Sequence, residues 1–275
     1  MFNDITFGQY FPADSFVHRL DPRAKLILLI FIIVLVFLAQ NAISLLIVFA
    51  LTASIILTSG IPVRLYFKSI KVIIPIVIFT AILNMFYTKT GVALLPDSWF
   101  FQIYSGGLLR AGYMAVRVLL LILVSSVLTF ITTPNDLTDA IERLLSPLKY
   151  VGLGEAVHTM SMMMTIALRF IPTLIEETNK IMNAQKARGA DLDGGNLINK
   201  VKALLPILIP LLISAVRRAY ELAEAMECRC YNGGKGRCRM KQMHLSFRDF
   251  ISFIVSILCL VGVILTNIFL KIGVI

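Results

Sequence analysis

The sequence predicts an all-α membrane protein with about five transmembrane helices and a cytosolic segment of one short and two long helices. Two observations indicate a membrane protein: 58% of the 275 residues are hydrophobic, and the mean hydropathy is +0.84, whereas soluble domains are about 45–50% apolar. The third observation is the helical spacing of apolar residues in the single long polar segment, about 133–246. We therefore predict a membrane domain over 1–132, a cytosolic domain over 133–246 and a fifth transmembrane helix within 247–275.

Five apolar stretches are candidates for crossing the bilayer. A transmembrane helix needs about 20 mostly apolar residues, so the first and third stretches are short and would include flanking residues. Only Gln40 and Asn41 separate the first two, which predicts a tight helical hairpin, with a re-entrant segment as the alternative. The five stretches are residues 24–39, 42–59, 72–87, 108–131 and 250–269.

The distribution of Lys and Arg predicts the orientation. The formal net charge is +10, and cytoplasmic loops of membrane proteins retain Lys and Arg. Basic residues gather before the first stretch, between the second and third, and along 133–246, so we place the N-terminus and the long segment in the cytoplasm. Trp99 and Tyr104 then lie in an outer connection as interfacial aromatics. Arg117, inside the fourth stretch, is either functional or extends to the outer headgroups.

The long polar segment contains a quasi-repeat. After a short helix that opens at Thr133-Pro134, two long helices are expected at about 155–188 and 197–229. Each ends in an Arg between compact residues and is followed by a glycine-containing stop. Pro172, Pro206 and Pro210 are expected to bend these helices. The pair Glu176-Glu177 is expected on a solvated helix face or in an intrachain ion pair.

The two arginines are the candidate functional residues, in Ala187-Arg188-Gly189 and Cys228-Arg229-Cys230. The C-terminal end of a helix favours a cation, and a guanidinium offers five donors in a planar fork that suits carboxylates or carbonyls of a partner. Compact neighbours would let that partner approach. The alternative is ordinary capping. Two such ends predict a force-transmitting subunit that binds a two-fold or pseudo-two-fold partner, and not an enzyme.

Other chemistry is weakly supported. The run Gly233–Arg237 lacks the GxxxxGK[ST] spacing of a nucleotide-binding loop, and no cofactor site is predicted. A zinc site is the alternative, although Cys-x-Cys is tighter than the usual spacing and arginines crowd the cluster. Its four ligands would be Cys228, Cys230, Cys238 and His244.

Several blocks carry a resemblance to a known family. The specific one is the Ala-Arg-Gly block within Ala184–Asp191. It is joined by Phe170–Glu177, Ala225–Tyr231 and Gly233–Arg237 and, in style, by Gly8–Arg23 and Thr132–Thr138. On these blocks the sequence resembles, over nearly its whole length, the T component of energy-coupling factor transporters, the ATP-driven vitamin importers of prokaryotes. That resemblance implies a coupling domain whose long helices cross in an X.

The resemblance also implies partners. The two Arg motifs would dock into two ATPase subunits, one each, and those partners would bind ATP and Mg²⁺. Family members usually have Ala-Arg-Gly or a similar small triplet at the second motif, where this chain has Cys on both sides of Arg229. The long helices would also hold a substrate-binding membrane S subunit, and nucleic acid is not expected as a partner. The S-subunit interface is expected at Met160, Met163, Met164, Leu168, Leu208 and Leu212.

Two alternatives stay open. One is a conventional transporter permease with its own substrate pathway, which would require polar residues facing one another within the membrane helices. The other is a zinc- or Cys-dependent membrane enzyme.

Overall fold

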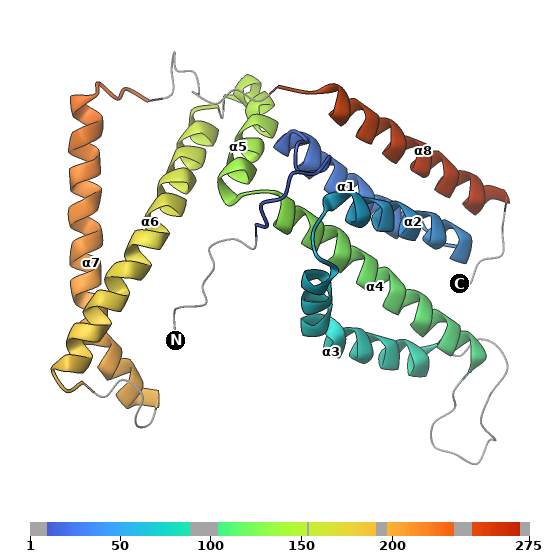
Figure 1. Ribbon diagram of the computed structural model, residues 1–275, viewed down its shortest axis with the longest axis horizontal. Coiled ribbons are helices and arrows are strands. Elements are labelled where there is room, and N and C mark those ends of the chain that lie inside the picture. The colour runs from blue at the N-terminus through green and yellow to red at the C-terminus, as the bar shows by residue number, and fades with distance from the viewer. Residues whose placement is uncertain (1–9, 89–103, 153, 191–196, 234–243, 270–275) are drawn as a thin grey trace. The chain divides into compact units, whose positions relative to one another are not determined.

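The computed structural model describes residues 10–88, 104–152, 154–190, 197–233 and 244–269. In these residues the chain forms eight α-helices and one 3-10 helix (Figure 1), which confirms the all-α prediction. The helices belong to two compact units, and the division falls between Ala140 and Ile141, inside helix α5 (Pro134–Leu144). One unit contains α1–α4 and α8, and the other contains the end of α5 with η1, α6 and α7.

The first unit holds the apolar helices. Among the described residues, α2, α3, α4 and α8 are long and apolar enough to cross a membrane. Helix α1 has 17 residues, so it is about 26 Å long at about 1.5 Å per residue, slightly less than a hydrocarbon core of about 30 Å. The bounds are Pro22–Leu38 for α1, Ala42–Ser59 for α2, Val63–Tyr87 for α3, Ser105–Ile131 for α4 and Phe247–Phe269 for α8.

Helix α3 begins earlier than the sequence predicted. It starts at Val63 and not near residue 72, so Arg64, Lys68 and Lys71 lie on the helix and not in a connection. Lys and Arg are good helix formers, and long basic stems can extend to a membrane surface, so these residue types are compatible with a longer helix. Pro75 lies inside α3 and cannot donate a backbone N–H to the preceding turn; Figure 1 shows α3 bent.

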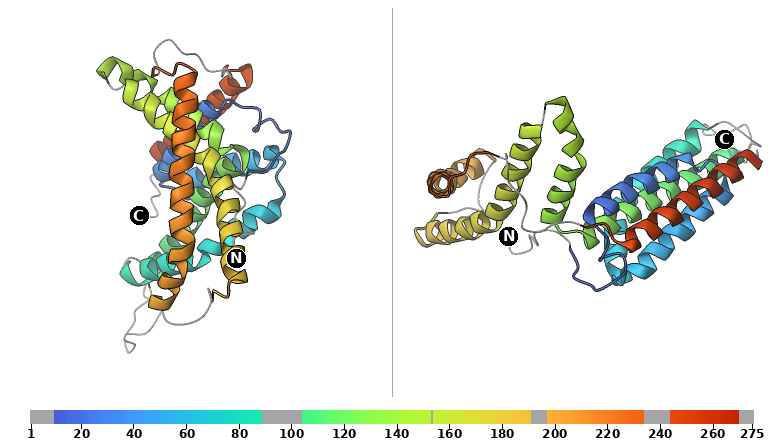
Figure 2. Two further views of the ribbon diagram at one scale, coloured as in Figure 1. Left: turned by 90° about the vertical axis from the view of Figure 1, so that its left-hand side faces the viewer. Right: turned by 90° about the horizontal axis from the view of Figure 1, so that it is seen from above.

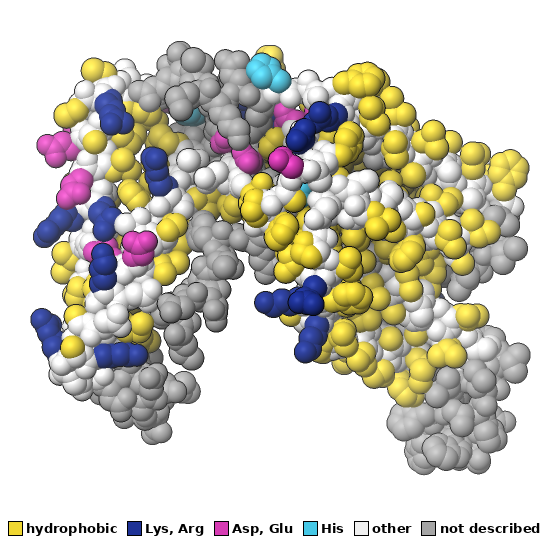
Figure 3. All heavy atoms as spheres, in the orientation of Figure 1, with side chains coloured by type: hydrophobic (Ala, Val, Ile, Leu, Met, Phe, Trp, Pro, Cys, Tyr) yellow, Lys and Arg dark blue, Asp and Glu magenta, His cyan; other side chains and the backbone are white. Residues whose placement is uncertain are grey.

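Four of these helices form a bundle. Helices α1 and α2 each pack against both α4 and α8, and α3 packs along α4 (Figure 2). Each helix of the bundle contributes an almost fully buried side chain to one core: Leu35, Val48, Leu120 and Val263. Figure 3 shows hydrophobic side chains over the outside of these helices as well, as expected where lipid is the solvent.

Asp249 joins the first and last helices of the bundle. Its carboxylate, 1% exposed, accepts hydrogen bonds from the backbone N–H of Asp21 at 2.9 Å and of Ser246 at 2.7 Å. Asp21 in turn caps α1 by accepting the N–H of Arg23 at 2.9 Å. The N-termini of α1 and α8 therefore share one carboxylate, where a negative charge is favoured by both helix dipoles.

Arg117 has a structural role that neither sequence-based alternative described. Its guanidinium donates to the carbonyl oxygen of Ala39, the C-cap of α1, and lies 4.9 Å from the centroid of the Tyr113 ring. The Tyr113 hydroxyl donates to the same carbonyl. The cation thus lies at the electronegative C-terminal end of α1, beside the tight connection that was predicted between α1 and the start of α2 at Ala42. Of the predicted interfacial aromatics, Trp99 lies outside the described residues.

The second unit is built on two long helices. Helix α6 spans Gly154–Ala187 and α7 spans Leu197–Cys228, each within one residue of the predicted bounds. A 3-10 helix, η1 (Ser146–Val151), follows α5 and packs on α6. Helix α6 continues through Pro172. Helix α7 contains Pro206 and Pro210, and Figure 1 shows its first part at an angle to the rest.

Candidate coupling site at the ends of two long helices

Helix α6 ends in a Schellman motif with Arg188 at its C-cap. The N–H of Gly189 donates to the carbonyl of Lys186 at 3.0 Å, and the N–H of Ala190 donates to that of Gln185 at 3.1 Å. This pair of bonds closes a helix through one left-handed residue, and Gly189 has φ +84°. Glycine is favoured at such a position because it has no Cβ.

Helix α7 ends in the same way with Arg229 at its C-cap. The N–H of Cys230 donates to the carbonyl of Glu227 at 2.8 Å, and the N–H of Tyr231 donates to that of Met226 at 3.0 Å. The left-handed residue that closes this helix is Cys230, with φ +53°, whereas the sequence suggested a stop at the glycines further on, of which Gly233 has φ +72°. Cys230 is thus the backbone counterpart of Gly189, and the two arginines occupy equivalent positions.

Both arginine side chains are exposed, and so are their neighbours Ala187, Gly189, Cys228 and Cys230. Within the described part of the chain, neither guanidinium has a hydrogen-bond or ion-pair partner. A side chain that only capped its own helix would lie against the last carbonyls. These two cations are instead available to a partner.

Helices α6 and α7 are antiparallel where they cross. Gln185 donates to the carbonyl of Pro206, and Glu177 pairs with Ser214 and Arg218 further along α7, so residue numbers fall on α6 as they rise on α7. Figures 1 and 2 show the two helices crossing. The C-terminal ends of α6 and α7, and with them the two arginines, therefore lie at opposite ends of the pair.

The predicted S-subunit interface is largely an exposed apolar surface. Met160, Met163 and Met164 on α6 are more than half exposed, as are Leu208 and Leu212 on α7, while Leu168 is partly buried. Such side chains cost free energy in water, at about 25 cal/mol per Å² of apolar area. Figure 3 shows Lys, Arg, Asp and Glu side chains over α6 and α7 too, so this unit has both apolar and charged surface. Exposed apolar side chains that gather in one patch mark a site for a membrane or a protein partner, which is the expectation for these residues.

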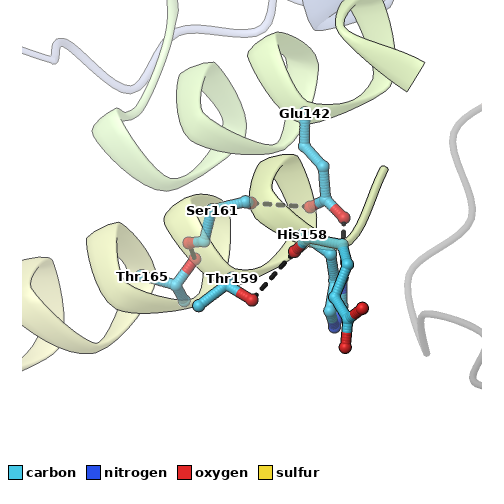
Figure 4. A network of polar contacts seen from close by, with 6 residues as sticks. Glu142, His158, Thr159, Ser161 and Thr165 are labelled. Carbon is cyan, nitrogen blue, oxygen red and sulfur yellow. Dashed lines mark hydrogen bonds and ion pairs between the residues drawn. The ribbon is translucent and has the colours of Figure 1, made fainter. Parts of the chain in front are cut away.

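The start of α6 is fixed to the end of α5 by Glu142. Its carboxylate lies 3.1 Å from Nδ1 of His158 and accepts a hydrogen bond from the Ser161 hydroxyl at 2.6 Å (Figure 4). His158 and Ser161 are one turn apart on α6, so the Glu142 side chain on α5 contacts two successive turns of α6. The sequence did not reveal this role, because the spacing between Glu142 and α6 follows no local pattern.

The zinc and permease alternatives gain no support from the described residues. They contain no group of three His, Cys, Asp or Glu side chains able to hold a metal ion, and Cys238 lies outside them. A cavity of about 260 Å³, partly open to the surface, lies in the bundle and is lined mainly by aliphatic side chains together with Lys25, Thr52 and Ser256. The Lys25 ammonium donates to the carbonyls of His18 at 2.8 Å and Ile131 at 3.0 Å, so it fastens backbone segments together.

Known proteins decide the family. The family model described as CbiQ, cobalt transport protein, matches residues 13–241. A Clostridium kluyveri protein named energy-coupling factor transporter transmembrane protein EcfT is 48% identical over 98% of both chains. Proteins of the same name from Ruminiclostridium cellulolyticum and Bacillus subtilis are 47% and 42% identical, each over 96% of this chain and 98% of the relative. This chain belongs to the EcfT family.

Membership confirms the resemblance read from the Arg motifs and flanking blocks. EcfT relatives are named as transmembrane proteins of a transporter, and this EcfT chain has several helices apolar enough to span a membrane. It is therefore a multi-pass membrane component of an energy-coupling factor transporter. The roles of Arg188 and Arg229 within such a transporter stay predictions.

Proposed function

We propose that this chain is the non-catalytic coupling subunit of an ATP-driven vitamin importer. One observation carries the proposal: Arg188 and Arg229 occupy the same C-cap position in two Schellman motifs, exposed at opposite ends of one antiparallel helix pair. Two equivalent cations facing opposite ways match a pair of equivalent or homologous subunits. In this proposal each arginine docks into one ATPase subunit.

The mechanism is mechanical. Binding and release of ATP closes and opens the ATPase pair, and the two docked arginines follow its subunits. Because each arginine ends a long helix, the motion changes the crossing angle or tilt of α6 and α7. The substrate-binding S subunit rests on the apolar surface that includes Met163 and Leu212, and the change of angle tilts or releases it.

The chain itself binds neither ATP, Mg²⁺ nor the vitamin in this proposal. ATP and Mg²⁺ bind to the partner ATPases, and the vitamin binds to the S subunit. The N-terminus and the unit that contains α6 and α7 are cytoplasmic, in agreement with the Lys and Arg distribution.

The test is to weaken docking at one or both helix ends. Arg188→Ala, Arg229→Ala and the double variant are co-expressed with the ATPase and S subunits, and the ATPase recovered with the tagged chain is quantified. Truncating one partner of a charge pair that becomes buried in a complex costs about 2–5 kcal/mol, a loss of affinity of about 30-fold or more. Each single variant should lose ATPase, and the double variant should lose more.

Arg169→Ala and Arg217→Ala are matched controls. Both arginines are exposed and lie inside α6 and α7, so the controls remove the same charge without touching a helix end. They should recover wild-type amounts of ATPase. Wild-type recovery and transport in the double variant Arg188→Ala/Arg229→Ala would show that the coupling role is wrong.

A further inference from the structure

The crossing of α6 and α7 contains a polar cluster. The Arg218 guanidinium donates to one carboxylate oxygen of Glu177 at 3.0 Å, and the Ser214 hydroxyl donates to the other. Ser214 and Arg218 are one turn apart on α7, so both face α6. Glu177 and Arg218 are partly buried, with side chains 22% and 35% exposed. We call these three residues the crossing cluster.

Apolar residues flank the crossing cluster at helical spacing. Leu174 and Ile181 lie one turn either side of Glu177 on α6, and Leu211 and Leu222 lie one turn beyond the pair on α7; all four are partly buried. An apolar contact is non-directional, so these leucines and isoleucine permit several registers and crossing angles. A single charged pair among them permits one register, the best-attested use of such groups at helix interfaces.

The crossing cluster is equidistant from the two arginine motifs. Arg188 is 11 residues beyond Glu177 (188 − 177), and Arg229 is 11 residues beyond Arg218 (229 − 218). At about 1.5 Å per residue, each C-cap arginine lies about 16 Å along its helix from the ion pair. Because the helices are antiparallel at this point, the two equal arms run in opposite directions.

We propose that Glu177 and Arg218 form the pivot of the coupling helices. The pair holds one point of α6 against one point of α7 while the helices change angle, so both arginines move by equal amounts in opposite senses. Sliding of one helix along the other would instead change the length of one arm relative to the other. Glu177 and Arg218 are positioning residues, and their role rests on the proposed docking of Arg188 and Arg229.

The test compares two single variants with their exchange. Glu177→Gln and Arg218→Gln remove the charge pair, and the exchanged pair Glu177→Arg/Arg218→Glu restores it with reversed polarity. In the assembled transporter we expect the single variants to retain the ATPases and hydrolyse ATP, while substrate transported per ATP falls about fivefold or more, the lower range of coupling between sites. The exchanged pair should recover most of that loss.

A second measurement follows the distance between the two arginine-bearing helix ends directly. Spin labels at Lys186→Cys and Glu227→Cys, both exposed positions beside the arginines, give the distance between the two ends by pulsed electron paramagnetic resonance. The background replaces the native cysteines, with Cys230→Gly to keep the left-handed turn. The single variants should broaden the distance distribution, and the exchanged pair should narrow it again.

Neighbouring residues provide matched controls. Glu176→Gln and Arg217→Gln make the same chemical changes one residue away, on the exposed side of each helix, and should leave transport per ATP and the distance distribution unchanged. Unchanged values in Glu177→Gln and Arg218→Gln, or failure of the exchanged pair to recover, would overturn the pivot. If a single variant does not assemble, the exchanged pair still tests the pivot, because it should assemble and show near wild-type transport per ATP and a narrow distance distribution. Failure of the docking proposal is separate, since it appears as ATPase retention in Arg188→Ala/Arg229→Ala.

Discussion

Replacing Asp249 should open the membrane bundle at one end. Asp249 is 1% exposed, and Asp249→Ala removes the acceptor for two backbone N–H groups, that of Asp21, which is buried, and that of Ser246, which lies in an exposed residue. Asp249→Asn keeps one acceptor oxygen but places an amide NH₂ against the second N–H. The two variants therefore remove different amounts of the same interaction.

The magnitude follows from the two bonds. A hydrogen bond to a charged group contributes about 1.5–3 kcal/mol, so the Ala variant should lose about 3–6 kcal/mol and the Asn variant about half of that. A domain of about 150–250 residues shifts its midpoint by about 2–4 °C per kcal/mol. We therefore expect the Ala variant to unfold about 6–24 °C lower than wild type.

Heating in mild detergent followed by size-exclusion chromatography measures the midpoint as loss of the monodisperse peak. Asp14→Asn is the control, because the Asp14 side chain is 90% exposed and pairs with Arg19 only at 3.5 Å; its midpoint should not change measurably, as for most surface ion pairs. An Asp249→Ala midpoint equal to wild type, or Asn melting below Ala, would refute the reasoning.

Three further predictions follow from the structure. Cys230→Gly should stabilise the chain by about 1 kcal/mol, because a left-handed conformation costs a non-glycine residue about 1–2 kcal/mol, and should leave ATPase recovery intact; a lower thermal midpoint would contradict the assigned turn. Burial lowers the pKa of His18 below 6.5, so the unfolded chain binds the proton more readily than the folded chain. The stability of the fold should therefore be full above pH 6.5 and fall as the pH drops below it. Thermal unfolding midpoints measured over about pH 5–8 should show this dependence in wild type and a flatter one in His18→Gln. The chain purified free of partners should not hydrolyse ATP, since it lacks a nucleotide-binding loop, and robust phosphate release would overturn its place as a non-catalytic subunit.

Helix positions were predictable where local signals were strong. The long helices α6 and α7 were predicted to within one residue, because apolar periodicity and the compact Arg motifs mark their length and ends. The start of α3 was not predictable in this way, because charges between two apolar stretches, such as Arg64 and Lys68, are typical of loops, although both residue types also favour helices. The Ser246-x-x-Asp249 spacing before an apolar run is a helix-start signal that could have indicated the cap of α8.

Contacts between distant residues could not be predicted from the sequence. The bond from Arg117 to the Ala39 carbonyl depends on how α4 packs against α1, and the Asp21–Asp249 bond joins residues 228 positions apart. The candidate site was predicted as residues but not as geometry. The left-handed Cys230 was missed because glycines follow it and a cysteine seldom takes that conformation.

The Asp21–Asp249 bond also sets an order of events during synthesis. With chain elongation at about 5–20 residues per second, Asp249 is made about 11–46 s after Asp21. Throughout that interval α1 and α2 lack their contact with α8, while the ribosome makes both long helices and their arginines. A chain truncated before α8 would therefore carry both proposed docking arginines but an unfinished bundle. Completion of the membrane unit is thus coupled to completion of the whole chain, and only a full-length product can present its helix ends on a closed bundle.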